Sequence, residues 1–221
     1  MPETARVSEI FLSLQGEGPS AGTPAHFLRL QGCTVGCRWC DTRYSWPADG
    51  GRELDPSTIW DQATSLGPAP LLVVTGGEPL EHPGLAELLR QALVRWAAVE
   101  VETSGILPPP ISHPRLGWNV SPKLPSATPR WAESWLHAAA WVAEPCATFK
   151  IVVGDPPDPD DARRLLAEHR VPPGRVMLMP EGMTDDVIRR HALELAELCK
   201  REGWRMSPRL HVWLWGARRG V

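Results

Sequence analysis

Lysine is scarce in this sequence of 221 residues. Lysine and arginine together number 23, but only Lys123, Lys150 and Lys200 are lysines. An ammonium group differs from a guanidinium in size, in hydration and in how readily its pKa shifts. In a chain that so strongly favours arginine, these lysines are either present by chance or held by chemistry that arginine cannot replace. The sequence leaves both explanations open.

Other absences exclude several classes of function. No basic run resembles a nucleic-acid footprint, and the formal net charge is −3. No apolar stretch approaches the roughly 20 residues that a membrane-spanning helix needs, and no secretory signal peptide opens the chain. Hydrophobic residues make up 43% of the chain, enough for a sizeable core. We therefore expect residues 1–221 to form a single cytoplasmic domain that handles a small molecule and binds neither nucleic acid nor membrane.

Cysteine is also rare, yet three of the five cysteines lie within eight residues. Cys33, Cys37 and Cys40 are separated by three residues and then by two. Thiolates this close on one loop can converge on a single metal centre. A closed structural zinc site and an ordinary four-iron cluster each take four protein ligands. Three thiolates would leave one iron of a [4Fe–4S] cluster free to take a ligand from solution, and the spacing favours this open-site cluster.

Other uses of these cysteines fit less well. A disulfide would leave one of the three unpaired, and a reducing cytoplasm disfavours it. Zinc would need further ligands, but the next histidine along the chain is His82, and no second Cys-x2-Cys exists. A ferredoxin-type electron carrier needs a fourth cysteine, which only the fold could supply from Cys146. Cys199 shares an apolar helix face with Ile188 and Leu195, so we expect it in the core.

Strand-like and helix-like segments alternate along the chain. The patterns predict strands at 7–12, 25–30, 71–75, 99–103, 118–120, 148–153 and 176–179, and a further strand within 205–215. They predict helices at 55–66, 83–96, 131–142, 158–170 and 184–201. This alternation favours an α/β fold with a mostly parallel sheet, arranged as a partial (β/α) barrel. Ligand sites in such sheets lie beyond the carboxyl ends of the strands.

Polar groups that contain glycine follow several of these strands. Gly76 and Gly77 would let a ligand approach the backbone closely, and Glu78 would supply an anionic contact. Residues 102–105, 121–123 and 180–182 should share one rim with this turn and with the cysteine loop. Upstream, loop 13–18 is either a simple turn or a binding loop in which backbone groups and Gln15 form hydrogen bonds with the edge of a heterocycle. Arg29 is either a solvated charge at the sheet edge or a guanidinium that binds a substrate carboxylate through two hydrogen bonds.

Together these segments resemble the 7-carboxy-7-deazaguanine synthases, a family of the radical S-adenosylmethionine (SAM) superfamily. The resemblance covers nearly the whole chain and rests on residues 14–18, Arg29, 32–42, 75–79, 102–103, 121–123 and 214–221. It implies a lyase in which SAM, bound to a [4Fe–4S] cluster, is cleaved to a 5'-deoxyadenosyl radical. That radical would take a hydrogen atom from 6-carboxy-5,6,7,8-tetrahydropterin, whose ring contracts with loss of ammonia. The product would be 7-carboxy-7-deazaguanine, on the route to queuosine, with SAM regenerated.

The resemblance also implies roles for individual residues. The cluster ligands would be Cys33, Cys37 and Cys40, and Thr42 would bind Mg²⁺. SAM would contact Trp39, Cys40, Asp41, Gly76, Gly77, Glu78, Ser121, Pro122 and Lys123. Substrate would contact Leu14, Gln15, Gly16, Arg29 and Thr75, with His211 and the terminal carboxylate of Val221 as further candidates.

The family further suggests a homodimer and an electron donor such as flavodoxin or ferredoxin. Two rival functions remain at this stage. One is a radical SAM activase that acts on a partner protein's glycine, and the other is a non-catalytic iron–sulfur electron carrier.

Overall fold

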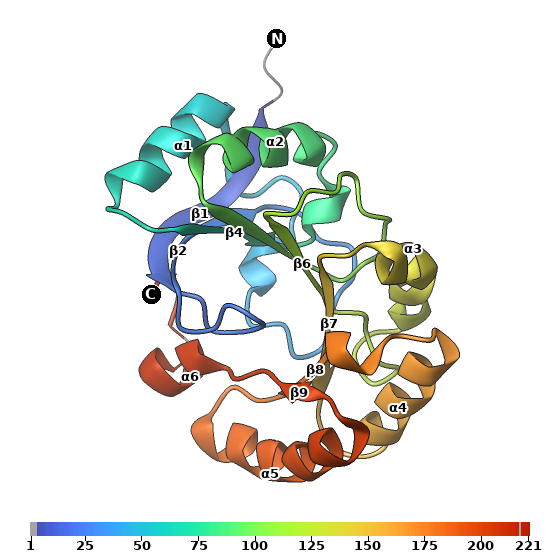
Figure 1. The fold of residues 1–221 in the computed structure, drawn as a ribbon. Helices are drawn as coiled ribbons and strands as arrows, with labels where there is room; N and C mark the ends of the chain where they lie inside the picture. Colours follow the sequence, from blue (N-terminus) through green and yellow to red (C-terminus); the bar gives the residue numbers. More distant parts are fainter. Residues whose placement is uncertain (1–3, 217) are drawn as a thin grey trace.

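The computed structural model describes residues 4–216 and 218–221, within which nine strands form one curved sheet (Figure 1). The strands are β1 (Ala5–Leu14), β2 (Pro24–Leu30), β3 (Arg52–Leu54), β4 (Leu71–Gly76), β5 (Ala98–Thr103), β6 (Leu116–Val120), β7 (Ala147–Val153), β8 (Val176–Pro180) and β9 (Arg205–Met206). The α-helices are α1 (Pro56–Ser65), α2 (Leu85–Arg95), α3 (Ala138–Ala143), α4 (Asp158–Glu168), α5 (Asp185–Glu202) and α6 (Leu210–Trp215). Short 3-10 helices are η1 (Arg43–Ser45), η2 (Pro79–Glu81), η3 (Trp131–Trp135) and η4 (Pro173–Arg175).

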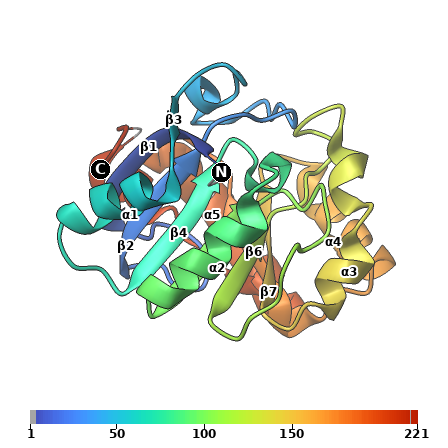
Figure 2. The ribbon, with the colours of Figure 1, turned by 90° about the horizontal axis from the view of Figure 1, so that it is seen from above.

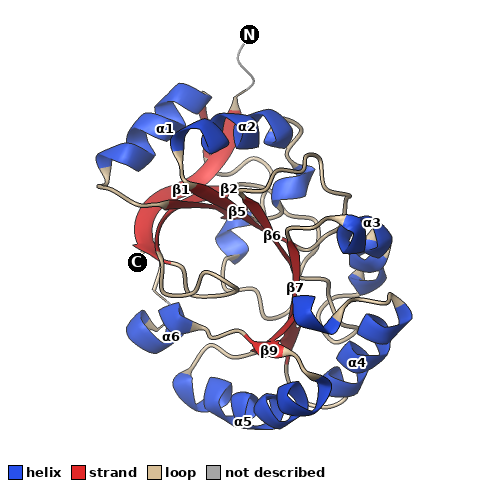
Figure 3. Ribbon diagram, in the orientation of Figure 1, coloured by secondary structure: helices blue, strands red, loops and turns tan. Residues whose placement is uncertain are grey.

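The sheet is mostly parallel and does not close. Its order is β3-β1-β2-β4-β5-β6-β7-β8-β9, and the neighbours from β2 through β9 are all parallel. β1 runs antiparallel to both β2 and β3. Over the described ranges no ladder joins the edge strands β3 and β9, and Figure 3 shows the sheet as an open arc with α1 to α5 on its outer side. The predicted α/β class and partial barrel are confirmed.

The two faces of the sheet differ in polarity because residues alternate along each strand. On β5, Val99 and Val101 are fully buried in the outer apolar layer, and Glu100 and Glu102 point to the other side. α1 packs on β1 and β2, α2 on β5, α4 on β7, and α5 on β8 and β9 (Figure 2). The helices therefore cover an apolar outer face, and the inner face keeps polar side chains available for a site.

Capping residues explain some of the helix boundaries. Asp55 accepts a hydrogen bond from the Thr58 N–H at 3.0 Å, and Pro56 occupies the first turn of α1. Gly203 ends α5 in the left-handed region, with φ of 70°. Thr184 holds the N-cap position of α5 but makes no side-chain capping bond. Cys199 is buried on α5, which confirms its expected place in the core.

Two predicted elements are wrong in form. The helix expected at 131–142 divides into η3 and α3. The tighter η3 turn lets Ser134 accept from the Lys123 N–H at 2.8 Å, and Trp135 Nε1 donate to the Lys123 carbonyl at 2.9 Å. The strand expected within 205–215 is limited to the two residues of β9, after which α6 forms. In addition, β3 is a short edge strand that the sequence patterns did not predict.

Among residues 4–216 and 218–221, no helix combines the length and the apolar character needed to cross a bilayer.

Candidate active site

A cavity of about 530 Å³ opens at the carboxyl ends of the parallel strands. It is lined from β1, β2 and the cysteine loop on one side, from the ends of β4 to β8 opposite, and from the C-terminal tail. The predicted site residues that line it are Leu14, Gln15, Gly16, Arg29, Cys33, Cys37, Trp39, Cys40, Asp41, Thr42, Thr75, Gly76, Gly77, Glu78, Ser121, Lys123 and Val221. Pro122 is not among the lining residues. Segments that are far apart in sequence thus meet around one space.

The three cysteines of the loop are free thiols that face this cavity. Burial raises the pKa of Cys33 to about 11 and also raises the pKa of Cys37, which the charge of Lys123 opposes. Trp46 Nε1 donates to Cys40 Sγ at 3.3 Å. Because thiols must lose their protons to bind metal, the raised pKa values of Cys33 and Cys37 mean that these two sulfur atoms need the charge of a metal centre to become thiolates.

The donor set fits an open-site cluster. Cys146 precedes β7 at the opposite, amino end of the strands, and Cys199 is buried in α5, so neither supplies a fourth thiolate. Among the described residues, no three or more His, Cys, Asp or Glu side chains are already arranged as a metal site. The cysteine loop therefore fits an open-site cluster because it presents three thiols, and not four, to one cavity.

The Gly-Gly-Glu turn after β4 packs directly against the start of the cysteine loop. A Cβ at Gly77 would lie 2.0 Å from the Gly32 carbonyl oxygen, so only glycine fits there. The Glu78 N–H donates to the same Gly32 carbonyl at 2.8 Å. These contacts fix the turn and the cysteine loop relative to each other, so a cofactor could touch both.

The Glu78 carboxylate is almost fully buried and held by four donors. Oε1 accepts from Thr103 Oγ1 at 2.5 Å and from the Leu80 N–H at 3.1 Å. Oε2 accepts from the N–H and the hydroxyl of Ser104, at 2.7 and 2.6 Å. This clamp fixes the orientation of the carboxylate at the cavity edge. On the next strand end, Lys123 Nζ donates to Ser121 Oγ at 3.2 Å.

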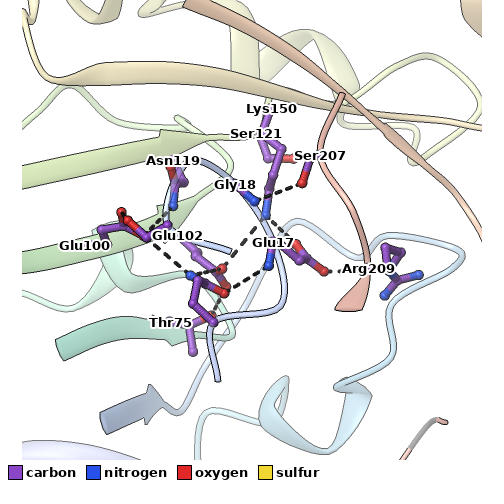
Figure 4. A network of polar contacts seen from close by, with 12 residues as sticks. Glu17, Gly18, Thr75, Glu100, Glu102, Asn119, Ser121, Lys150, Ser207 and Arg209 are labelled. Carbon is purple, nitrogen blue, oxygen red and sulfur yellow. Dashed lines mark hydrogen bonds and ion pairs between the residues drawn. The ribbon is translucent and has the colours of Figure 1, made fainter. Parts of the chain in front are cut away.

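A polar network covers the inner wall of the cavity (Figure 4). Gln15 Nε2 donates to Glu102 Oε1 at 3.2 Å, and Thr75 Oγ1 donates to Glu102 Oε2 at 3.0 Å. Glu100 lies behind them and accepts from Asn119 Nδ2 at 3.1 Å. Burial raises the pKa of Glu100. The predicted substrate residues Gln15 and Thr75 therefore both donate to Glu102, which the sequence placed on the rim of the site without a role of its own.

A second set of charges connects this wall to the cysteine loop. Lys150 bonds to Glu17, and Arg209 Nε lies 3.6 Å from the other oxygen of Glu17. Arg209 also donates to Asp41 Oδ2 at 2.7 Å. His211 Nε2 lies 3.8 Å from Glu17. Burial alone would raise the pKa of Glu17, but the charges of Lys150, Arg209 and His211 lower it to about 2.

Sequence reasoning missed most of this set. Glu17 lies inside the recognised loop 13–18 and could have been found there as its one carboxylate. The scarcity of lysine was the only sequence feature that drew attention to Lys150. No feature pointed to Arg209, because its segment was predicted to be a strand.

Arg29 is fixed by a cluster at the cavity mouth. Its Nε donates to Glu9 Oε1 at 2.7 Å, and Tyr44 Oη donates to the same oxygen at 2.5 Å. Arg219 donates to Glu9 Oε2 at 2.9 Å and lies 3.9 Å from the centroid of the Tyr44 ring. The cluster holds the C-terminal tail, and with it Val221, against the cavity, and Figure 1 shows the C-terminus beside β2.

Comparisons with known proteins show the family to which the chain belongs. Residues 28–115 match the family model described as the Radical SAM superfamily. The 7-carboxy-7-deazaguanine synthase of Pyrobaculum aerophilum is 41% identical, over 97% of this chain and 96% of its own length. The enzyme of that name from Escherichia coli is 32% identical, over 94% of this chain and 97% of its own length.

The fold agrees as well. The crystal structure of QueE from Escherichia coli superposes with a TM-score of 0.67 at 27% identity, covering 92% of this chain and 93% of that one. Membership in the superfamily implies a [4Fe–4S] cluster and SAM. The chain belongs to the 7-carboxy-7-deazaguanine synthase family of radical SAM enzymes.

Proposed function

We propose that this chain converts 6-carboxy-5,6,7,8-tetrahydropterin to 7-carboxy-7-deazaguanine with loss of ammonia, as a step toward queuosine or another 7-deazapurine. The observation that supports this most is the single cavity described above. It presents a cysteine loop, a Gly-Gly-Glu turn and a carboxylate-lined wall to the same space. One side of this space suits a cluster and SAM, and the other suits a small polar heterocycle.

The cofactor side follows from the loop and the strand ends. Cys33, Cys37 and Cys40 would hold the cluster, and SAM would rest on residues 39–41, 76–78 and 121–123. When bound, the cluster and SAM supply the 5'-deoxyadenosyl radical that takes a hydrogen atom from the substrate. Gly77 lets the turn pack against the cysteine loop, and the clamped Glu78 offers a fixed anion for the amino group of SAM. Pro122 would contribute by shaping the turn, since it does not line the cavity.

The substrate side offers partners for several polar features of the pterin. Arg29 presents a guanidinium for the carboxylate. Backbone groups of Leu14 and Gly16 would meet the ring edge, with Gln15 and Thr75 behind them. The pterin carries N–H donors on its amino-pyrimidinone ring, and carboxylates are the acceptors that bind such donors best.

Further parts of the proposal extend the family resemblance. Thr42 lies beside Cys40 on the cavity wall, and its oxygen suits Mg²⁺, a hard cation that prefers oxygen ligands. The terminal carboxylate of Val221 and the ring of His211 would border the substrate. We also propose that residues 1–221 act as one radical SAM domain, in a cytoplasmic homodimer that takes electrons from flavodoxin or ferredoxin.

An anaerobic turnover assay tests the function. The cluster is reconstituted, and SAM, Mg²⁺, dithionite and 6-carboxytetrahydropterin are added before mass spectrometry. We expect 7-carboxy-7-deazaguanine that vanishes when SAM is omitted. Formation of 5'-deoxyadenosine without this product would reject the substrate and keep the radical class, as an activase would require. Neither product from a fully loaded cluster would favour the electron carrier.

The same assay tests the role of His211. A His211→Ala variant with unchanged turnover and unchanged substrate affinity would remove this residue from the site.

A further inference from the structure

The buried ammonium of Lys150 is unusual for this chain. Lys150 is one of only three lysines and its side chain is 5% exposed. It lies on β7 between Phe149 and Ile151, which are fully buried in the outer apolar layer, so Lys150 points into the cavity instead. A buried charge persists only when it is paired, and the pairing of Lys150 shows what the charge does.

Lys150 lies between two carboxylates that come from different parts of the chain. It bonds to Glu17 Oε2, from the loop after β1, and lies 3.8 Å from Glu102 Oε1 on β5 (Figure 4). Both carboxylates line the cavity, and their side chains are 14% and 22% exposed. Lys150 therefore fixes the separation of two acceptors that no shared backbone element holds together.

Other groups nearby do not duplicate this role. Arg209 reaches Glu17 but not Glu102 among the described ion pairs, and it divides its charge between Glu17 and Asp41. His211 lies close to Glu17 alone. Glu100, behind the wall, adds a third carboxyl group whose bonds go to Gln15, Ser20 and Asn119. Within the described residues, Lys150 is the cation that contacts both wall carboxylates.

A lysine suits this position better than an arginine. Its compact ammonium carries three rotatable donors and can approach two oxygens from different directions, whereas a guanidinium is a planar fork that matches one carboxylate. This offers a physical reason why the position keeps a lysine in a chain rich in arginine.

We propose that Lys150 is a positioning residue, which holds Glu17 and Glu102 as a matched pair of acceptors for the N–H donors of the substrate's amino-pyrimidinone ring. This inference rests on the proposed function and deepens it. Lys150 acts through the two carboxylates and does not touch the reacting atoms. Its loss should therefore weaken substrate binding much more than it slows the chemistry.

The test compares Lys150→Met, Glu17→Gln and the double variant with the wild-type holoenzyme. Lys200→Met is the matched control, because Lys200 is exposed on α5 and pairs only with Glu197 among the described contacts. Breaking a buried charge pair costs about 2 kcal/mol or more, so we expect the KM of Lys150→Met for the pterin to rise about 30-fold or more. We expect kcat to change less than about threefold, and substrate-free formation of 5'-deoxyadenosine and iron content to match the wild type.

The double variant separates positioning from a general structural role. If Lys150 acts through the two carboxylates, the double variant should bind the pterin more weakly than Glu17→Gln alone only by the share that the 3.8 Å contact with Glu102 contributes, which is less than the loss expected for Lys150→Met. This comparison decides the matter even if Lys150→Met does not fold. Additive losses, or a fall in kcat with unchanged KM, would overturn the inference. A wild-type enzyme that makes no product from the pterin would instead reject the proposed function.

Discussion

Replacing Glu78 with glutamine should destabilise the protein well beyond the loss of a surface charge. Each oxygen of Glu78 accepts from a backbone N–H, that of Leu80 on one side and that of Ser104 on the other. Hydroxyl groups such as Thr103 Oγ1 can rotate to accept instead of donate, but a backbone N–H cannot. Whichever way the amide of glutamine turns, its NH₂ therefore faces a fixed donor.

The magnitude follows from this geometry. One buried backbone N–H loses its acceptor, which costs about 1–3 kcal/mol, and the remaining bonds lose their charge assistance. We expect Glu78→Gln to lower the free energy of unfolding by about 3 kcal/mol in total. For a chain of this length, that lowers Tm by about 6–12 °C.

Thermal unfolding of the reconstituted protein under argon measures the effect, with iron content determined in parallel. Glu87→Gln is the matched control, since Glu87 is an exposed residue of α2, and its replacement should change stability by less than about 0.5 kcal/mol. Affinity for SAM should also fall in Glu78→Gln. If Glu78→Gln has the same Tm as Glu87→Gln, the two backbone donors do not depend on Glu78, and the hydrogen bonds assigned to its carboxylate are wrong.

Three further predictions concern the rest of the site. Cys37→Ala should lose the cluster and Cys199→Ala should keep it, so equal iron content in the two variants would refute the ligand assignment. Gly77→Ala should push the turn away from the Gly32 carbonyl and lower both Tm and SAM affinity, and a normal SAM titration would contradict this. The pKa of Glu17 falls from 4.5 to about 2 on folding, so its stabilisation is complete above about pH 4.5 and is lost as the pH falls toward 2. In urea unfolding, the difference between wild type and Glu17→Gln should therefore shrink from pH 6 to pH 3, and a constant difference would refute the pKa shift.

The cofactor side of the site could be predicted from the sequence because its information is local. Three cysteines within eight residues limit the metal chemistry by spacing alone. Two glycines at the end of an apolar strand predict a close approach to the backbone, and in the structure it is the chain itself, at Leu30 and Gly32, that packs against them where the sequence predicted a ligand. Each signal lies within one loop, so no knowledge of strand pairing was needed.

The C-terminal segment could not be predicted in the same way. Residues 210–215 are almost all apolar and aromatic, a composition typical of a strand. In the structure the Leu210 N–H donates to the Gly16 carbonyl at 2.9 Å, and α6 follows from that anchor. Tertiary contact overrides local preference here, and it brings Arg209 and His211 to the cavity wall.

The substrate side depends on registers that the sequence does not display. Glu17 and Lys150 lie 133 residues apart and meet only because loop 13–18 folds over the inner face of a sheet in which β7 is several strands away from β1. Glu102 joins them because alternation on β5 turns it inward. An ion pair of this kind is lost when the strand shifts its register by one residue, since such a shift moves every side chain of the strand to the other face of the sheet. Substrate recognition in this protein should therefore be more sensitive to changes in strand register than cluster binding is.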